Sequence, residues 1–135
     1  AGRAAQRSLA GMRDDAKADA LHSAARALRA AESDVLGANA LDLDAGAENG
    51  LSAAMLDRLR LDSARLGAIA DAVDQVARLP DPVGAIIDRA ERPNGLAFSR
   101  VRVPVGLIGI VYESRPNVTA DAAALCVRAG NAVLL

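Results

Sequence analysis

The side chains best suited to chemistry stand together in residues 113–117, which read Glu113-Ser114-Arg115-Pro116-Asn117. An Arg guanidinium binds a phosphate or a carboxylate through two parallel hydrogen bonds, and an Asn amide can donate to a developing oxyanion. Ser114 and Glu113 can form hydrogen bonds with a sugar or an amide group. The segment contains no nucleophile, so it predicts a binding site that stabilises negative charge. The alternative is purely structural: Pro116 and Asn117 shape a turn, and Glu113 forms an ion pair with Arg115.

Two further residues of reactive types, Cys126 and His22, do not predict a second site. Cys126 follows an apolar run within a predicted helix, where a thiol is expected to be buried as a small hydrophobic group. His22 is the only His of the chain and has no Cys or second His at a ligand spacing. We therefore expect His22 on the surface, and we predict neither a metal site nor a Cys–His pair.

The elements on both sides of residues 113–117 place this segment at the edge of a parallel sheet. Residues 105–112 are almost wholly apolar, as expected for a strand buried on both faces. Thr119 can cap a helix over residues 120–128, and residues 131–135 begin a second buried strand. Strand, helix and strand form a parallel crossover, and ligands of open α/β sheets bind at the carboxyl ends of such strands. The predicted fold class is α/β.

A different strand precedes this crossover. Residues 96–105 alternate between small or apolar side chains and Phe98, Arg100 and Arg102, and this period predicts a strand with an exposed face. Two outward arginines fit an edge strand or a strand between subunits. The boundary between this strand and the first part of the chain is predicted near Pro93-Asn94-Gly95.

The first part of the chain is predicted to be mostly helical. Leu21 and Ala25 belong to a helically spaced apolar face and predict a helix of about 15 to 20 residues. Gly37 and the turn-rich residues 44–50 are expected to end a second helix near Asp44.

Two later helices are predicted from their capping residues. Ser52 can cap a short helix, and either Asp62 or Ser63 can cap a longer one. Pro80 closes that longer helix from beyond its end.

The composition excludes several classes of partner. With 16 basic and 17 acidic residues and a net charge of -1, the chain has no basic stripe for nucleic acid and no polybasic arm for a membrane. No apolar stretch reaches the roughly 20 residues that cross a bilayer. A single Cys and no recognisable leader favour the reducing cytoplasm. Because the sequence stops inside its last predicted strand, we expect a fragment of a larger α/β protein.

The last third of the chain carries a family resemblance. Residues 101–135, VRVPVGLIGIVYESRPNVTADAAALCVRAGNAVLL, closely resemble the γ-glutamyl phosphate reductase (glutamate-5-semialdehyde dehydrogenase) family. The block ESRPNVTADAA is the most specific part, and RPNGL at residues 92–96 and DPVG at residues 81–84 support it. The implied fold is aldehyde dehydrogenase-like. It consists of N-terminal helices, a strand of oligomerisation type and the first β-α-β unit of a Rossmann-like cofactor domain.

The resemblance implies a function and assigns roles to the segment between the predicted strand and helix. The implied enzyme of proline biosynthesis uses NADPH to reduce L-glutamyl 5-phosphate to L-glutamate 5-semialdehyde, with release of phosphate. Tyr112, Glu113 and Ser114 would contact the nicotinamide end of NADP(H). At the oxyanion position of the superfamily, an ungapped alignment on the PVG motif places Arg115, and Asn117 stands two residues later. We favour Asn117 for the oxyanion and Arg115 for the acyl phosphate or the substrate carboxylate.

The resemblance also implies a division of the chain. Residues 1–95 would form the helical part of the cofactor domain, residues 96–105 the oligomerisation strand and residues 106–135 the start of the cofactor-binding core. The catalytic domain and its Cys nucleophile would lie beyond Leu135, so this chain alone would be inactive. The implied partners are a small-molecule substrate and further copies of the chain in a homo-oligomer. The alternatives are a non-catalytic nucleotide-binding module and a helical interaction module.

Overall fold

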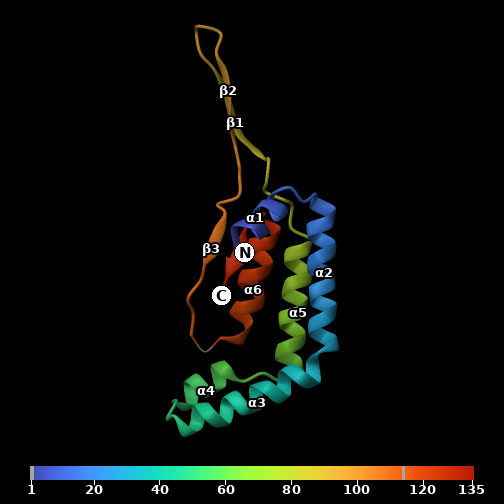
Figure 1. Ribbon diagram of the computed structural model, residues 1–135, viewed down its shortest axis with the longest axis vertical. Helices are drawn as coiled ribbons and strands as arrows, with labels where there is room; N and C mark the ends of the chain where they lie inside the picture. The colour runs from blue at the N-terminus through green and yellow to red at the C-terminus, as the bar shows by residue number, and fades with distance from the viewer. Residues whose placement is uncertain (1, 114) are drawn as a thin grey trace.

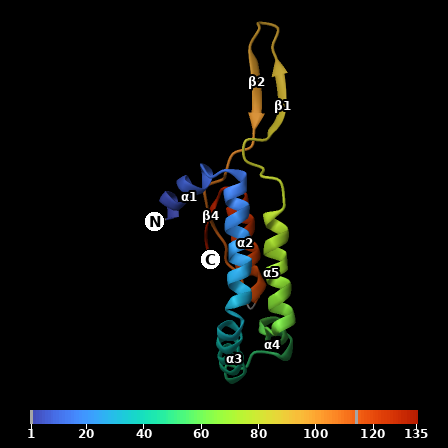
Figure 2. The ribbon, with the colours of Figure 1, turned by 90° about the vertical axis from the view of Figure 1, so that its right-hand side faces the viewer.

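In the computed structural model, which describes residues 2–113 and 115–135, three helices lie side by side and form the body of the molecule (Figure 1). Two more helices lie across one end of this body, and an antiparallel hairpin projects from the other end (Figure 2). No helix of the described residues is long and apolar enough to cross a membrane. In chain order the elements are α1 (Gly2–Ala10), α2 (Asp14–Ala30), α3 (Glu32–Glu48), α4 (Ala53–Leu59), α5 (Ser63–Ala77), β1 (Ile86–Glu91), β2 (Ala97–Val101), β3 (Leu107–Gly109), α6 (Pro116–Arg128) and β4 (Ala132–Leu134).

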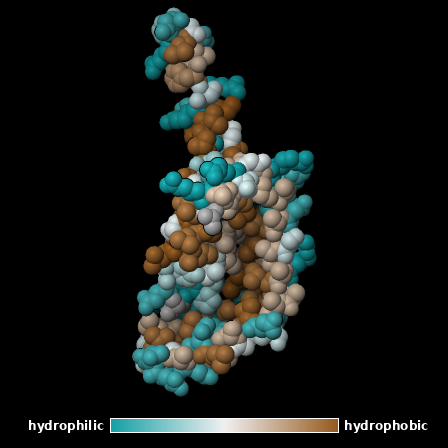
Figure 3. All heavy atoms as spheres, in the orientation of Figure 1, coloured by the Kyte–Doolittle hydropathy of each residue, from teal (hydrophilic) through white to brown (hydrophobic). Residues whose placement is uncertain are grey.

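The core lies where α2, α5 and α6 meet. The helix predicted around Leu21 and Ala25 is confirmed, because α2 has 17 residues and buries both side chains. The core is rich in Ala, so each helix buries little apolar area. It is open on one side, where apolar side chains line a hollow (Figure 3). The core residues are Leu21, Ala25, Ala70, Val73, Ala77 and Ala124.

Helix α3 does not end where the sequence predicts. It runs through Gly37 and Asp44 and stops only at Glu48. Gly46 lies inside this helix and packs closely against the residue that follows the helix: a Cβ at this position would lie 2.9 Å from Leu51 Cδ1. A glycine read as a helix end is thus a point of close approach.

Side chains fix the helices that follow α3. Ser52 caps α4, as predicted, and of the two candidates for the next cap it is Asp62 that accepts from the first turn of α5. The buried Asn39 of α3 donates to the Leu59 carbonyl oxygen at 2.9 Å and accepts from the Leu61 N–H at 2.7 Å. These bonds attach α3 to the connection between α4 and α5.

Strand β1 is unexpected from the sequence. It pairs antiparallel with β2, and the chain turns between them at Pro93-Asn94-Gly95. Gly95 has a positive φ of 81°, as a three-residue hairpin turn of this kind requires. The predicted boundary between helical and extended parts at these residues is therefore wrong, because they form the tip of a hairpin.

The register of the hairpin explains why β1 escapes pattern analysis. The pairing of β1 with β2 shifts between Ile86 and Asp88, because Ile86 pairs with Val101 and Asp88 pairs with Arg100, so that Ile87 is an extra residue. The two adjacent isoleucines therefore lack the alternation of apolar and polar side chains that marks a strand. Strand β2 occupies Ala97–Val101, which is the first half of the predicted residues 96–105.

The predicted parallel crossover is confirmed, since β3 and β4 pair in parallel with α6 between them. Helix α6 begins at Pro116, earlier than the predicted cap Thr119, because proline suits the first turn of a helix. The strands are shorter than predicted and are not buried on both faces: Leu107 is 44% exposed and Leu134 is 67% exposed. Within the described residues each strand has a neighbour on one edge only, which leaves its other edge unpaired.

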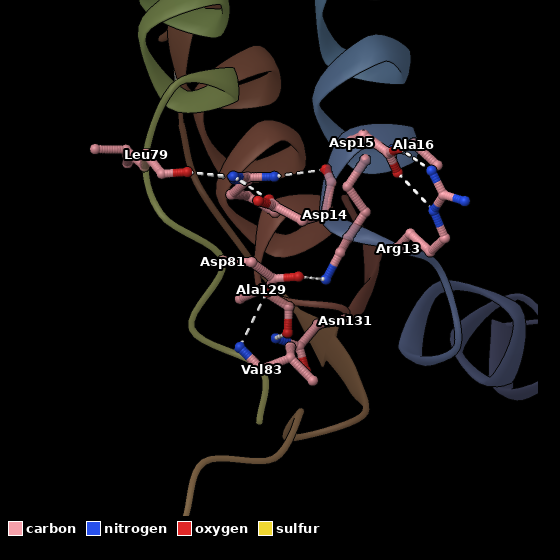
Figure 4. Close-up of polar contacts among 11 residues, drawn as sticks. Arg13, Asp14, Asp15, Ala16, Leu79, Asp81, Val83, Ala129 and Asn131 are labelled. Atoms are coloured by element: carbon pink, nitrogen blue, oxygen red, sulfur yellow. Dashed lines mark hydrogen bonds and ion pairs between the residues drawn. The ribbon is translucent and has the colours of Figure 1, made fainter. Parts of the chain in front are cut away.

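Buried charges hold the C-terminal end of α6 (Figure 4). The Arg128 side chain is 6% exposed; its Nε donates to the Leu79 carbonyl oxygen at 2.7 Å, and its Nη2 lies 2.5 Å from Asp14 Oδ1. Lys17, whose side chain is fully buried, forms an ion pair with Asp81. Burial by itself would raise the pKa of the Asp81 carboxyl, but contact with Lys17 and a backbone N–H, with the charge of Arg128, lowers this pKa below its ordinary value. The four side chains, which we call the charged junction, join α2, α6 and the segment that leads to the hairpin.

Gly130 lies where α6 meets the base of the hairpin. Its φ is +70°, and a Cβ there would lie 3.0 Å from Pro104 Cγ and 3.2 Å from Val83 Cγ2. The next residue, Asn131, accepts a hydrogen bond from the Gly106 N–H at 2.8 Å. This contact fixes the start of β3 against the start of β4.

Candidate functional site

The segment between β3 and α6 lies at the carboxyl end of β3, as predicted. The Ile110 N–H donates to the Leu134 carbonyl oxygen at 3.0 Å, and the chain then leaves the sheet. Residues 111–113 and Arg115 are exposed, and α6 begins at Pro116. Polar side chains are thus held between a strand end and the first turn of a helix, which is the usual ligand position in an open α/β sheet.

Of the three residues predicted to contact a nicotinamide, Tyr112 and Glu113 are described, and Ser114 lies outside the described residues. The Tyr112 hydroxyl forms a hydrogen bond with the Thr119 hydroxyl, which fixes the ring against α6. Glu113 is exposed, and none of the ion pairs among the described residues joins it to Arg115. A fixed ring and an exposed carboxylate suit a flat ligand with an amide group.

Arg115 and Asn117, the two candidates for the oxyanion position, lie on different sides of the first turn of α6. Arg115 lines the apolar hollow, Asn117 lines a smaller pocket, and Pro116 between them lines both. Arg115 precedes the helix and has a non-helical backbone (φ -138°, ψ 87°), whereas Asn117 belongs to the first helical turn, so the two side chains leave the chain in different directions. The structure therefore brings both candidates to one turn but gives each its own cavity.

The hollow that Arg115 lines has a volume of about 1,000 Å³ and is bounded by α2, α3, α5 and α6. This volume is at the upper end of the range of about 300–1,000 Å³ for ligand pockets. Most of its lining is Ala, Val and Leu. The polar side chains that line it are Asn39, Asp42, Tyr112, Arg115 and Thr119.

The pocket that Asn117 lines has a volume of about 360 Å³ and is rich in charge. Asn117 Nδ2 donates to Asp121 Oδ2 at 3.0 Å on one wall. Arg58, Arg60 and Arg65, from the region of α4 and α5, also line the pocket. The sequence favours a solvated helix face for these arginines, so the fold alone brings them to Asn117. The only feature of the sequence that could have indicated their role is that three arginines stand close together between residues 58 and 65.

The remaining reactive side chains, Cys126 and His22, lie outside both cavities. The prediction that Cys126 is buried is confirmed: it is 6% exposed, and burial raises the pKa of its thiol. His22 is only partly exposed on the surface: its side chain is 33% exposed, and its Nδ1 lies 2.7 Å from Asp74 Oδ1 on α5. This hydrogen bond and a second from Arg29 lower the pKa of the Asp74 carboxyl.

Comparison with curated proteins gives a consistent result. No protein-family model matches the chain. The chain is 65% identical over its whole length to γ-glutamyl phosphate reductase of Novosphingobium aromaticivorans, and 66% identical over 119 residues to that of Sphingopyxis alaskensis. These matches cover 32% and 28% of the two relatives, so the chain spans about a third of the length of the curated relatives it matches.

Solved structures agree with the curated relatives. The crystal structure of γ-glutamyl phosphate reductase from Thermotoga maritima matches 98% of the chain with a TM-score of 0.92 and 39% identity. That of Saccharomyces cerevisiae also matches 98%, with a TM-score of 0.91 and 32% identity. The chain covers 32% and 34% of these two structures. The predicted resemblance and the predicted α/β, aldehyde dehydrogenase-like fold class are confirmed.

Proposed function

We propose that this chain is part of a γ-glutamyl phosphate reductase, which reduces L-glutamyl 5-phosphate to L-glutamate 5-semialdehyde and releases phosphate. The observation that carries the proposal is the match to the Thermotoga maritima enzyme over 98% of this chain at 39% identity. Since the chain spans about a third of such enzymes, we propose that the Cys nucleophile lies in the rest of a longer protein. The chain alone would then be inactive.

In this proposal the first turn of α6 stabilises the reacting acyl group. Asn117 donates an amide hydrogen to the carbonyl oxygen on which negative charge develops. Its Nδ2 has two hydrogens, and one is directed to Asp121 at 3.0 Å, which orients the amide and leaves the other for the ligand. Arg115, exposed beside it, binds the acyl phosphate or the substrate carboxylate through two hydrogen bonds.

The proposed cofactor is NADP(H), which supplies the hydride when bound, with its nicotinamide end at Tyr112, Glu113 and Ser114. Two of these residues fit the group. The Tyr112 ring is fixed by its hydroxyl and offers a flat apolar surface to a nicotinamide ring. The exposed Glu113 carboxylate can accept a hydrogen bond from the carboxamide.

The remaining proposals concern organisation. We propose that residues 1–95 contribute the helices of the cofactor domain together with β1, that residues 96–105 are the oligomerisation strand with which β1 pairs, and that residues 106–135 begin the cofactor-binding core. The hairpin would join copies of the chain in a homo-oligomer, since it exposes Ile87 and Phe98. The single buried thiol fits a cytoplasmic location.

The test is the phosphate-dependent reduction of NADP by glutamate 5-semialdehyde, measured on the full-length protein that contains this chain. Asn117→Ala should lower kcat about 100-fold or more, because an oxyanion donor is lost. Arg115→Ala should raise the KM for phosphate about 10-fold, because a charged hydrogen-bond donor is lost. The matched control is Asn49→Ala: Asn49 is an exposed Asn at a helix end that bonds the Ala45 carbonyl oxygen, and kcat should be unchanged.

The outcomes separate the roles. An inactive wild-type protein refutes the proposed function. A loss of kcat in Arg115→Ala as large as that in Asn117→Ala would transfer the oxyanion role to Arg115.

A further inference from the structure

The small pocket beside Asn117 contains more charge than an oxyanion site needs. Its walls carry both signs: three guanidinium groups on the side of α4 and α5, and the Asp121 carboxylate on α6. Asn117 belongs to the same pocket, so a ligand that reaches Asn117 with its reacting carbonyl can extend toward these charges. The pocket is therefore placed to recognise a second part of the same molecule.

The three arginines are not equivalent. Arg65 is committed to the protein: it donates to the carbonyl oxygens of Asp57 at 2.6 Å and Arg60 at 3.0 Å and pairs with Asp57 Oδ1 at 2.9 Å. Its role is to hold the end of α4 against α5. By contrast, no hydrogen bond or ion pair of the Arg58 or Arg60 side chain is found among the described residues, and both side chains are exposed. These two guanidinium groups are available to a ligand.

The charge pattern matches one chemical class. An α-amino acid carries a carboxylate and an ammonium group on one carbon, and it is recognised by a cation and an anion that line one pocket. Arg58 and Arg60 supply the cations, and Asp121 supplies the anion. The apolar Leu61 and Ile69 also line the pocket and fit the methylene groups that join the α-carbon of the substrate to its reacting carbonyl group. Its volume of about 360 Å³ falls in the range of small-molecule sites.

We propose that this pocket binds the α-amino-acid end of the substrate, with the carboxylate on Arg58 and Arg60 and the ammonium group on Asp121. The inference rests on the proposed function and adds the specificity-determining residues to it. A phosphate group fits the pocket less well, because the Asp121 carboxylate would repel a dianion. The acyl phosphate instead lies on the other side of Asn117, toward Arg115.

The experiment compares three aldehydes in the phosphate-dependent reaction of the full-length protein. Glutamate 5-semialdehyde has both charged groups, 4-aminobutanal lacks the carboxylate, and 5-oxopentanoate lacks the ammonium group. Each variant is compared with the wild type on the same aldehyde, so differences in reactivity and in the fraction of free aldehyde cancel. The variants are Arg58→Ala/Arg60→Ala and Asp121→Asn, and the control is Arg26→Ala, an exposed arginine of α2 that bonds Ser23.

The expected losses are selective. Arg58→Ala/Arg60→Ala should lower kcat/KM about 30-fold or more for the two aldehydes with a carboxylate and less than about 3-fold for 4-aminobutanal. Asp121→Asn should lower kcat/KM about 10-fold for the two aldehydes with an ammonium group and spare 5-oxopentanoate. Inhibition by L-norvaline, which has the amino-acid end without an aldehyde, gives a readout that needs no chemistry at the ligand. Its Ki should rise in both pocket variants and stay unchanged in Arg26→Ala.

Three results would overturn the inference. Equal losses on all three aldehydes would mean that Asp121 only positions Asn117 and that the arginines only support the fold. A raised KM for phosphate in Arg58→Ala/Arg60→Ala, with no selectivity among aldehydes, would place the phosphate in this pocket. A wild-type protein without the reaction would remove the proposed function itself, whereas an active wild type with unselective variants would remove this inference alone.

Discussion

The two ends of α6 carry the same kind of side chain and use it in opposite ways. At the C-terminal end, Arg128 is 6% exposed, and it is held by the Leu79 carbonyl oxygen and the Asp14 carboxylate. At the N-terminal end, Arg115 is exposed and faces a cavity, and Asn117 faces another.

The difference teaches that the partners of a polar residue, and not its type, decide between a structural and a functional role. A guanidinium that leaves water must have its hydrogen bonds supplied by the protein, because an unpaired buried charge is very costly. For Arg128 they come from the carbonyl oxygens of Leu79 and Asp14 and from the Asp14 carboxylate, whereas buried Lys17 has the Asp81 carboxylate as its ion-pair partner. An exposed guanidinium keeps its donors for a ligand, and the cost of holding it there is small.

The largest expected effect is on the buried end. Arg128→Met should lower the free energy of unfolding by about 3 kcal/mol, because it leaves the Leu79 carbonyl oxygen without its donor and removes the pairing with Asp14. Arg115→Met, the same substitution at the other end of the helix, should change it by less than about 0.5 kcal/mol. Urea unfolding midpoints at equal slopes measure both. If the two variants lost similar stability, the contrast between the two ends would be refuted.

A smaller effect is expected within the charged junction. Lys17→Met should cost about 2 kcal/mol, since the side chain of Asp81, only 14% exposed, loses its cation. Adding Asp81→Asn should restore part of this loss, because an amide is less costly to bury than an unpaired carboxylate. A double-mutant cycle on unfolding free energies measures the coupling. Additive losses would show that the two side chains act independently.

The smallest effect is a pH dependence that isolates Asp81. Because the folded protein lowers the pKa of this carboxyl, the group stabilises the fold fully above its unfolded pKa of about 3.9. This stabilisation is lost as the pH falls through the lower folded pKa. The difference in stability between the wild type and Asp81→Asn should therefore be constant near neutral pH and shrink below about pH 4. Thermal unfolding at a series of pH values tests this, and a constant difference down to pH 2 would contradict it.

Much of the fold could be predicted where the determinants are local. The parallel crossover follows from two apolar runs around a helix, and Ser52 and Asp62 cap their helices with a contact three residues away. Strand β1 could not be predicted, because the register shift after Ile86 removes the alternation that marks a strand. Pattern analysis fails there for a physical reason.

The position of the candidate site in the chain could be predicted, but the residues that line its two cavities could not. Arg115 and Asn117 follow from the chain itself, since they stand between an apolar strand and a helix. Their separation into two cavities depends on α6 beginning at Pro116, which sets their directions. The guanidinium wall of Arg58 and Arg60 comes from another part of the chain, and only tertiary packing brings it to Asn117.

The junction at Gly130 has a consequence for heritable variation. Two independent demands meet at this residue: a left-handed backbone conformation, and a tight space in which a Cβ would lie 3.0 Å from Pro104 Cγ and 3.2 Å from Val83 Cγ2. Asparagine tolerates the conformation in many turns but would press against Pro104 and Val83, and alanine would make the same tight contacts and would also be strained in its backbone. A glycine such as Gly95, which has the same left-handed conformation but open space around it, is subject to the first demand only. Homologous proteins that keep this packing at the base of the hairpin are therefore expected to keep glycine at this position.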